Sequence, residues 1–221
     1  MRPPKSTPKS PTRAERLRLA SVQRREQQRE HLRQTILTAA GELFLAFGYE
    51  GFSMRQVAER IGYSATTIYR YFANKDDLLF AIVYKGFQQF GHELLAAAQS
   101  TDDPAQRLEA LGRAYIKFGI ENPVYYQLMF MQRADLLFQR RAKQTPPPIE
   151  SFNILQHAMQ QAIDAGVLRL GNAETYSHVL WALVHGITSL AVARMPHFTA
   201  PNLELTANTA LQIGLEGLRR R

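Results

Sequence analysis

The residues best suited to bind a partner lie between Ser64 and Phe72, where hydroxyl groups, an arginine and aromatic rings follow one another closely. In a helix, Ile68 and Phe72 are four residues apart and point to the same side, toward the protein. Hydroxyl groups suit phosphate oxygens, and an arginine can read guanine through two hydrogen bonds. The segment therefore predicts a helix that enters the major groove of DNA. Its outward side would carry Ser64, Ala65, Thr67, Tyr69, Arg70 and Tyr71.

The segments before Ser64 predict the two helices that such a recognition helix needs for support. Apolar residues recur every three or four positions from Leu32 to Phe47, and Gly48 is expected to end that helix. Ser53 begins a capping-box pattern for a second, short helix. Gly62 then predicts a tight turn, with Ser64 as the N-cap of the third helix. Three helices in this order predict a helix-turn-helix.

The run FGYEGFSMRQVAERIGYSATTIYRYFANKDDLLFAIV, from Phe47 to Val83, resembles the DNA-binding domain of the TetR family of repressors. The resemblance covers residues 31–85. It implies that the residues beside the phosphate backbone, at the start of the second helix, are Ser53, Met54 and Arg55. It implies that the end entering the groove carries Ser64, Ala65, Thr66 and Thr67. The side chains implied to reach phosphates or bases are Tyr69, Arg70, Tyr71 and, at the start of the fourth helix, Lys75.

Two of these assignments have structural alternatives. Tyr69 and Tyr71 could instead pack in the core, and Ser53 and Ser64 could serve only as helix caps.

The distribution of charge supports a partner that is a polyanion. The chain has a formal net charge of +8. Residues 1–30 carry +6 of it, residues 31–75 carry +2, and the remaining residues sum to zero. Residues 1–12 are rich in proline and serine and are expected to be disordered. Residues 13–33 predict either a solvated helical extension or an arm that orders on its partner, adding contacts to the backbone or minor groove.

The rest of the chain predicts helices separated by proline and glycine. Asn74 is expected to start one that runs to about Ala98, and Asp103 and Asn122 precede prolines that start two more, the second reaching about Arg141. A loop is expected at 146–148, then helices ending near Gly166 and covering 173–195 and 203–218. The predicted fold is all-α with about nine helices. Its predicted parts are an arm (1–30), a helix-turn-helix domain (31–85) and a ligand-binding and dimerisation domain (86–221).

Two stretches of the second half resemble the C-terminal class of the TetR family that carries a Trp…His-Gly signature. They are Trp181–Gly186 and Asn122–Phe130. The resemblance implies a domain in which the last two long helices form a four-helix interface with a second subunit. The helix predicted at 173–195 is apolar on nearly every side, which also calls for cover by a partner and predicts a homodimer.

Aromatic residues gather in the middle of this second half, together with methionines. They are as well explained by an ordinary core as by a pocket for a hydrophobic or aromatic small-molecule effector. The residues predicted to contact such an effector are Tyr115, Phe118, Tyr126, Phe130, Trp181 and His185.

Several classes of protein receive no support from the sequence. There is no cysteine, and no phosphate-binding glycine loop or nucleophile motif. His178 and His185 are seven residues apart, which is unlike a zinc pair. We therefore predict no enzyme, metal, cofactor or membrane segment, and a cytoplasmic regulator of transcription, a repressor on palindromic double-stranded DNA. The alternatives are activation, a helical carrier or enzyme on the same fold, and a non-specific architectural DNA binder.

Overall fold

The computed structural model describes residues 12–131, 147–196, 198 and 200–220. Over these residues the protein consists of nine α-helices and a short π-helical segment, without a strand, which confirms the all-α prediction. An isolated β-bridge joins Leu168 to Arg219. In the same ranges, no helix has both the length and the apolarity needed to cross a membrane.

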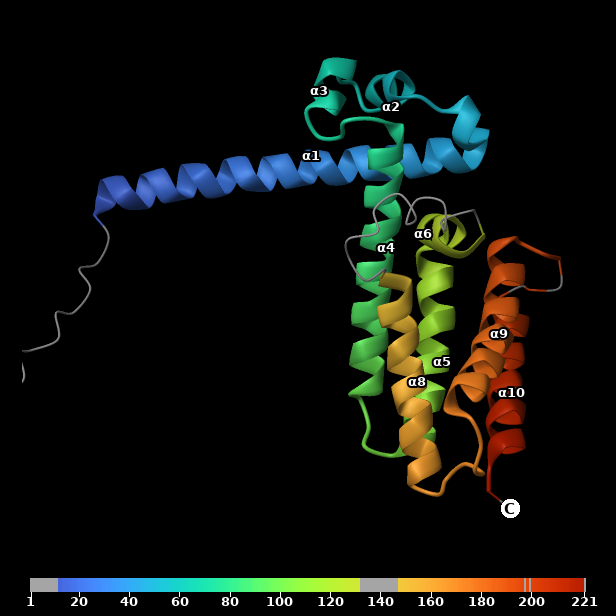
Figure 1. Cartoon of the computed structure of the whole chain (residues 1–221). Helices are drawn as coiled ribbons and strands as arrows, with labels where there is room; N and C mark the ends of the chain where they lie inside the picture. Colours follow the sequence, from blue (N-terminus) through green and yellow to red (C-terminus); the bar gives the residue numbers. More distant parts are fainter. Residues whose placement is uncertain (1–11, 132–146, 197, 199, 221) are drawn as a thin grey trace, which may run out of the picture.

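The first helix, α1 (Arg13–Gly51), unites the basic segment with the predicted helix that follows it. Thr12 caps it: its hydroxyl accepts from the Glu15 amide at 3.3 Å, and the Glu15 carboxylate accepts from the Thr12 amide at 2.6 Å. Residues 13–31 are exposed, and full burial starts only at Ile36. Figure 1 shows this first half of α1 as a rod that projects from the body. In the free chain, residues 13–31 therefore form a solvated helical extension.

Two short helices follow, α2 (Met54–Arg60) and α3 (Ala65–Tyr69). Gly48, with a φ of 69°, interrupts α1 as predicted, although one more turn follows before α2. Gly62, with a φ of 74°, makes the turn between α2 and α3, where most other residues would be strained. The predicted end of the third helix at Phe72 is wrong. The chain tightens after Tyr69, where the Tyr71 amide donates to the Ile68 carbonyl at 2.9 Å in a 3₁₀-type bond.

The fourth helix, α4 (Lys75–Ala98), is the longest element of the body and joins its two ends. Asn74 caps it by accepting from the Asp77 amide at 2.8 Å, as the sequence predicts. Its buried side begins at Leu78 beside α1 and continues through Phe90 and Leu94 among the helices that follow α4 in the chain. The predicted domain boundary at 85/86 therefore falls inside one continuous helix.

The lower body is a bundle in which α4 packs against α5 (Pro104–Glu121) and α8 (Pro147–Asp164), and α5 also packs against α9 (Ala173–Val192). The last helix, α10 (Ala200–Leu218), lies beside α9 on the side away from α4 (Figure 1). Gly112 lets α5 approach α10, since a Cβ there would overlap the Leu211 side chain. After α5, the chain continues as the short α6 (Pro123–Tyr126) and the π-helical η1 (Gln127–Met131), which run beneath α1 in Figure 1.

Three boundaries in this half differ from the predictions. Pro147, predicted in a loop, starts α8, because proline lacks only an amide that the first turn does not use. Helix α9 ends at Val192 rather than Met195, because Arg194 has a left-handed φ of 55°. Helix α10 begins at Ala200, three residues before the predicted start. The helix predicted from Asn122 to Arg141 is described only to Met131, and the remainder of that prediction lies outside the described residues.

Candidate nucleic-acid interface and effector site

Helix α3 is held in place by apolar anchors on one side only. Ile68 is fully buried and Phe72 is 3% exposed, and both belong to the core that α1, α2 and α4 share. Burying each of these side chains stabilises the fold by about 1.5–3 kcal/mol. The Tyr63 amide also donates to the Ala58 carbonyl at 2.9 Å, which fixes the turn before α3. The other side of α3 is left free to meet a partner.

That free side carries polar and aromatic groups. Thr66 and Arg70 are exposed, and Tyr69 is 55% exposed. Core packing, the alternative considered for the tyrosines, does not apply to Tyr69, whereas Tyr71 is half-buried beside the core. The remaining predicted groove residues, Ala65 and Thr67, are half-buried, and Ser64 is exposed.

The two predicted serines both cap helices. Ser53 accepts from the Gln56 amide at 3.3 Å and donates to the Gln56 side chain at 2.9 Å. Ser64 accepts from the Thr67 amide at 3.2 Å, and its hydroxyl lies 2.9 Å from that of Thr67. Capping therefore uses both hydroxyls in the free protein, and a phosphate would have to share or replace these bonds.

Met54 and Arg55 occupy opposite environments at the start of α2. Met54 is 5% exposed and packs in the core, so the prediction of a DNA contact by its side chain is not supported by its position. Its backbone amide is the first of α2, and the free amides at a helix N-terminus can bind an anion. Arg55 is exposed, and its guanidinium forms a 3.0 Å ion pair with Glu59 one turn later.

Lys75 has a role that the sequence analysis did not foresee. Its ammonium group donates to the Tyr49 carbonyl at 2.6 Å and lies 3.9 Å from the centre of the Tyr49 ring. A longer bond of 3.5 Å reaches the Phe52 carbonyl. The Tyr49 hydroxyl donates to Asp76 at 2.5 Å. Lys75 and Asp76 thus tie the start of α4 to the last turn of α1 and, through Phe52, to the residue after it. No regular spacing of residues signals this contact.

A second cluster lies in the bundle, where the six residues predicted to contact an effector meet. Phe118 and Tyr126 are fully buried and Tyr115 is 5% exposed, whereas Phe130, Trp181 and His185 are half-buried. Phe90 of α4, which the prediction omitted, lies 5.0–5.6 Å from the ring centres of Tyr115, Phe118 and Phe130. Its place on the apolar side of α4 is the signal that could have included it.

His185 is at the centre of this cluster. The hydroxyls of Tyr115 and Tyr126 lie 2.9 and 2.8 Å from its Nδ1, and the Tyr126 hydroxyl is also 3.2 Å from the His185 carbonyl. The Trp181 indole donates to the Tyr115 hydroxyl at 3.2 Å. The donors of Tyr115, Tyr126 and Trp181 are all used if Tyr115 donates to Nδ1 and Tyr126 donates to the carbonyl. Nε2 then carries the proton, and among the described residues it has no hydrogen-bond partner.

Burial sets the protonation of this network. It lowers the pKa of His185, raises the pKa of Tyr126 to about 12, and raises the pKa of Tyr115 as well, with the nearby Tyr126 adding to that rise. The imidazole and both hydroxyls are therefore neutral at pH 7. A neutral site of this kind favours an uncharged, largely apolar ligand. In the described part of the chain, no group of three His, Cys, Asp or Glu side chains is placed to hold a metal ion.

The same arrangement occurs in known proteins. Residues 36–82 match the bacterial regulatory proteins of the tetR family, and residues 108–212 match the tetracyclin repressor-like C-terminal domain. The chain belongs to the TetR family. The helix-turn-helix matches the family's N-terminal domain and the bundle matches a C-terminal domain of the family, so the resemblance of both halves is confirmed.

Individual relatives are more distant. The chain is 30% identical over 102 residues to the HTH-type transcriptional activator FasR of Mycolicibacterium smegmatis, covering 46% of this chain and 47% of FasR. It is 34% identical over 104 residues to the repressor KstR of the same organism, covering 47% and 50%. The match thus spans about half the length of these relatives. A tetR-family regulatory protein from Rhodococcus RHA1 shares the fold, with a TM-score of 0.72 and 18% identity over 86% of this chain and 97% of that one.

The position of Lys75 predicts a measurable contribution to stability. Lys75→Met keeps the apolar stem but removes the hydrogen bonds to the Tyr49 and Phe52 carbonyls. We expect the free energy of unfolding, measured in urea, to fall by about 1–2 kcal/mol. Lys117→Met is the matched control, since Lys117 is exposed on α5 and only 4.0 Å from Glu121. Equal stability of the two variants would contradict the tethering role.

The low pKa of His185 predicts a dependence of stability on pH. The unfolded chain gains a proton as the pH falls through about 6.5, whereas folded His185 resists protonation until its lower pKa is reached. The wild-type protein should therefore lose stability across this interval, and His185→Gln should lose less. Urea midpoints measured at about pH 7.5 and about pH 5.5 test this. The same fall in both proteins would show that His185 is not the group responsible.

Proposed function

We propose that this protein is a homodimeric, sequence-specific regulator of transcription that represses from a palindromic operator. The main support is the exposed polar side of α3, held against the core by Ile68 and Phe72. All the net positive charge of the chain lies in residues 1–75, the part that contains this face. The proposed DNA contacts are those expected from the sequence, with Met54 acting through its backbone amide and Ser53 and Ser64 sharing their capping role.

The basic arm, the exposed half of α1, extends this proposed interface. Its helix projects past α3 in Figure 1 and carries arginines with few acidic neighbours. Neutralising backbone phosphates releases counterions, so such contacts add affinity without adding sequence preference. The arm therefore strengthens binding to DNA that flanks the operator.

The proposed dimer interface is the apolar surface of α9 and α10. Exposed aliphatic side chains lie on both helices, with Val179 54% and Leu190 40% exposed on α9, and Leu205 69% and Ile213 65% exposed on α10. Gly186 has open space where a Cβ would stand, so a second helix could approach α9 closely. Exposed apolar surface of this kind marks a protein interface.

The proposed effector site is the cluster around His185. Its half-buried rings suit a small hydrophobic or aromatic molecule, and the unpartnered Nε2–H suits a hydrogen-bond acceptor such as a carbonyl oxygen. Helix α4 carries Phe90 in this cluster and begins at Lys75, shortly after α3. A ligand that moves α4 therefore changes the position of α3. By linkage, DNA must lower the affinity for the effector as much as the effector lowers the affinity for DNA.

DNA selection tests the proposed function. Full-length protein is used to enrich duplexes from a random pool, and we expect a palindrome with half-sites about 34–36 Å apart or at a longer spacing. Arg70→Ala should relax the preference at one position of each half-site, costing about 1–3 kcal/mol there, if Arg70 reads a base. The control Arg194→Ala removes an exposed arginine in the connection after α9. Enrichment of no sequence would overturn the proposal and would favour an architectural binder or a carrier.

The dimer proposal has its own test. Ile213→Glu places a charge in the apolar surface of α9 and α10, and we expect sedimentation equilibrium to show a shift from dimer toward monomer. Leu95→Glu is the control, because Leu95 is 46% exposed and belongs to α4. Figure 1 shows α4 on the side of the bundle away from α10. A dimer that survives Ile213→Glu with wild-type affinity would exclude this surface as the interface.

A further inference from the structure

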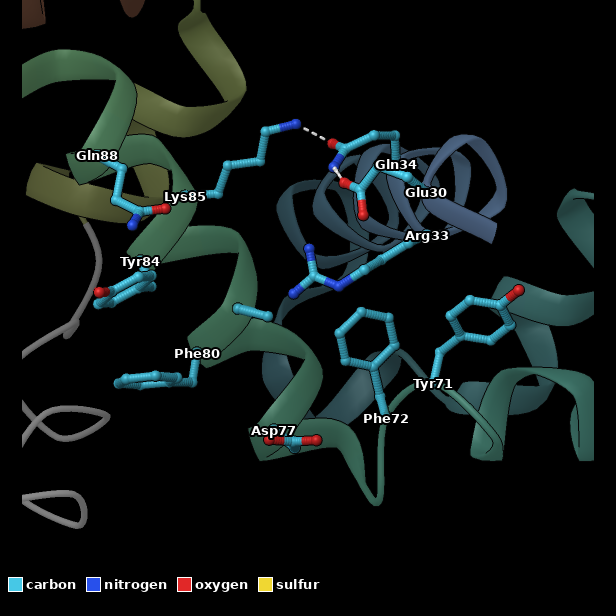
Figure 2. Close-up of a pocket in the computed structure, with 11 residues that line it drawn as sticks. Glu30, Arg33, Gln34, Tyr71, Phe72, Asp77, Phe80, Tyr84, Lys85 and Gln88 are labelled. Carbon is cyan, nitrogen blue, oxygen red and sulfur yellow. Dashed lines mark hydrogen bonds between the residues drawn. The ribbon is translucent and has the colours of Figure 1, made fainter. Parts of the chain in front are cut away.

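A cleft of about 380 Å³ lies where α1 crosses α4. It contains none of the residues of the cluster around His185, and it shares Tyr71 with the proposed DNA interface. In Figure 2, Glu30, Arg33 and Gln34 enter it from α1, and Phe80, Tyr84 and Lys85 belong to α4. Its volume is that of a pocket for a small molecule.

Arg33 is the residue of the cleft best suited to bind a ligand. The side chain is half-buried, and its guanidinium lies 5.4 Å from the centre of the Phe72 ring. Figure 2 shows it reaching from α1 toward α4. Among the residues that the structure describes, none accepts a hydrogen bond from this guanidinium. A guanidinium has five N–H donors, and those of Arg33 remain accessible from the cleft, where an entering acceptor can bond to them.

The acidic groups of the cleft are already engaged elsewhere. The Glu30 carboxylate accepts from the Gln34 amide at 2.5 Å, and the Gln34 oxygen accepts from the Lys85 ammonium group. Asp77 accepts from the Ala73 amide at 3.1 Å at the start of α4. Burial lowers the pKa of Lys85, which reflects an ammonium group partly withdrawn from water. The cleft thus has two carboxylates and two cations. Among the hydrogen bonds of the described residues, Arg33 is the cation that bonds to neither Glu30 nor Asp77, nor to Gln34, which accepts from Lys85.

Helix α4 contributes an apolar part to the lining of the cleft. The rings of Phe80 and Tyr84 stack with their centres 5.8 Å apart, and Ala81 also belongs to the lining. A planar anionic group could bond to the guanidinium through two parallel hydrogen bonds. An attached aromatic or aliphatic body could then lie along the apolar wall of α4.

We propose that this cleft binds a small organic anion, a carboxylate with an aromatic or aliphatic body, with Arg33 as its anchor. The ligand bridges α1 and α4 beside Phe72, the residue that seats α3 in the core. The site does not depend on DNA binding or on an effector at His185, and it can be tested in the absence of both.

Calorimetric titration of the full-length protein with 2-naphthoate tests the proposal. We expect binding to the wild-type protein and a loss of affinity of about tenfold or more in Arg33→Gln, since a charge-assisted pair is removed. The uncharged 2-naphthamide should bind the wild type more weakly than naphthoate and should not distinguish the wild type from Arg33→Gln. Arg194→Gln, which removes an exposed arginine outside the cleft, should leave the titration unchanged.

A second variant guards against a folding defect in the first. Tyr84→Ala removes one stacked ring from the apolar wall and should also weaken naphthoate. Naphthoate that fails to bind the wild type, or that binds Arg33→Gln as tightly as the wild type, would overturn the proposal. So would loss of DNA affinity with a shallower salt dependence in Arg33→Gln while naphthoate binding persists, because Arg33 would then serve a DNA phosphate.

Discussion

The continuous burial of one side of α4 is the constraint on which the rest of this structure depends. Leu78 and Ile82 of this helix are fully buried beside α1, and Phe90 and Leu94 are buried in the bundle. A single rigid helix therefore belongs to both cores. Neither core can shift without the other, because a break in α4 would expose apolar side chains and lose helical hydrogen bonds. The N-terminus of the same helix is tied by Lys75 to the last turn of α1.

This arrangement gives the TetR fold of the chain its division of labour. The short α2 and α3 contribute few apolar residues and rely on α1 and α4 to seat Ile68 and Phe72. Because α3 is anchored on one side only, its other side need not be apolar. That side carries the exposed Thr66 and Arg70. The bundle meets the opposite need. It buries aromatic rings around His185 in a neutral, hydrogen-bonded network and leaves aliphatic side chains outside on α9 and α10.

Helix α1 carries basic side chains in two different surroundings. The first half of α1 continues well beyond its contact with the body, and only capping at Thr12 and helix propensity hold it. Such a helix is marginal alone in water and is stabilised here by continuity with the buried half. Where that buried half begins, Arg33 turns into the cleft against α4 instead of into solvent. The basic residues of the arm are therefore exposed, whereas Arg33 and Lys85 of the cleft are half-buried.

The sequence determined by itself the features that depend on neighbours along the chain. Periodic apolar residues, the caps at Ser53, Ser64 and Asn74, and glycine at 48 and 62 predicted the helices and the helix-turn-helix, because these signals act within one or two turns. The family motifs added the assignment of both halves, now confirmed. Helix ends were less certain where local geometry decided them, as at Tyr69, Arg194 and Pro147.

Only the tertiary structure decided which side chains meet across distant segments. It placed the Met54 side chain in the core, directed Lys75 to the Tyr49 carbonyl, and brought Phe90 to His185's aromatic neighbours. It also joined Arg33 of α1 to the wall of α4. None of these contacts has a fixed spacing, because each depends on the angle at which two helices cross and on the space left between them. Local patterns therefore specified the elements, and the packing of those elements specified the sites.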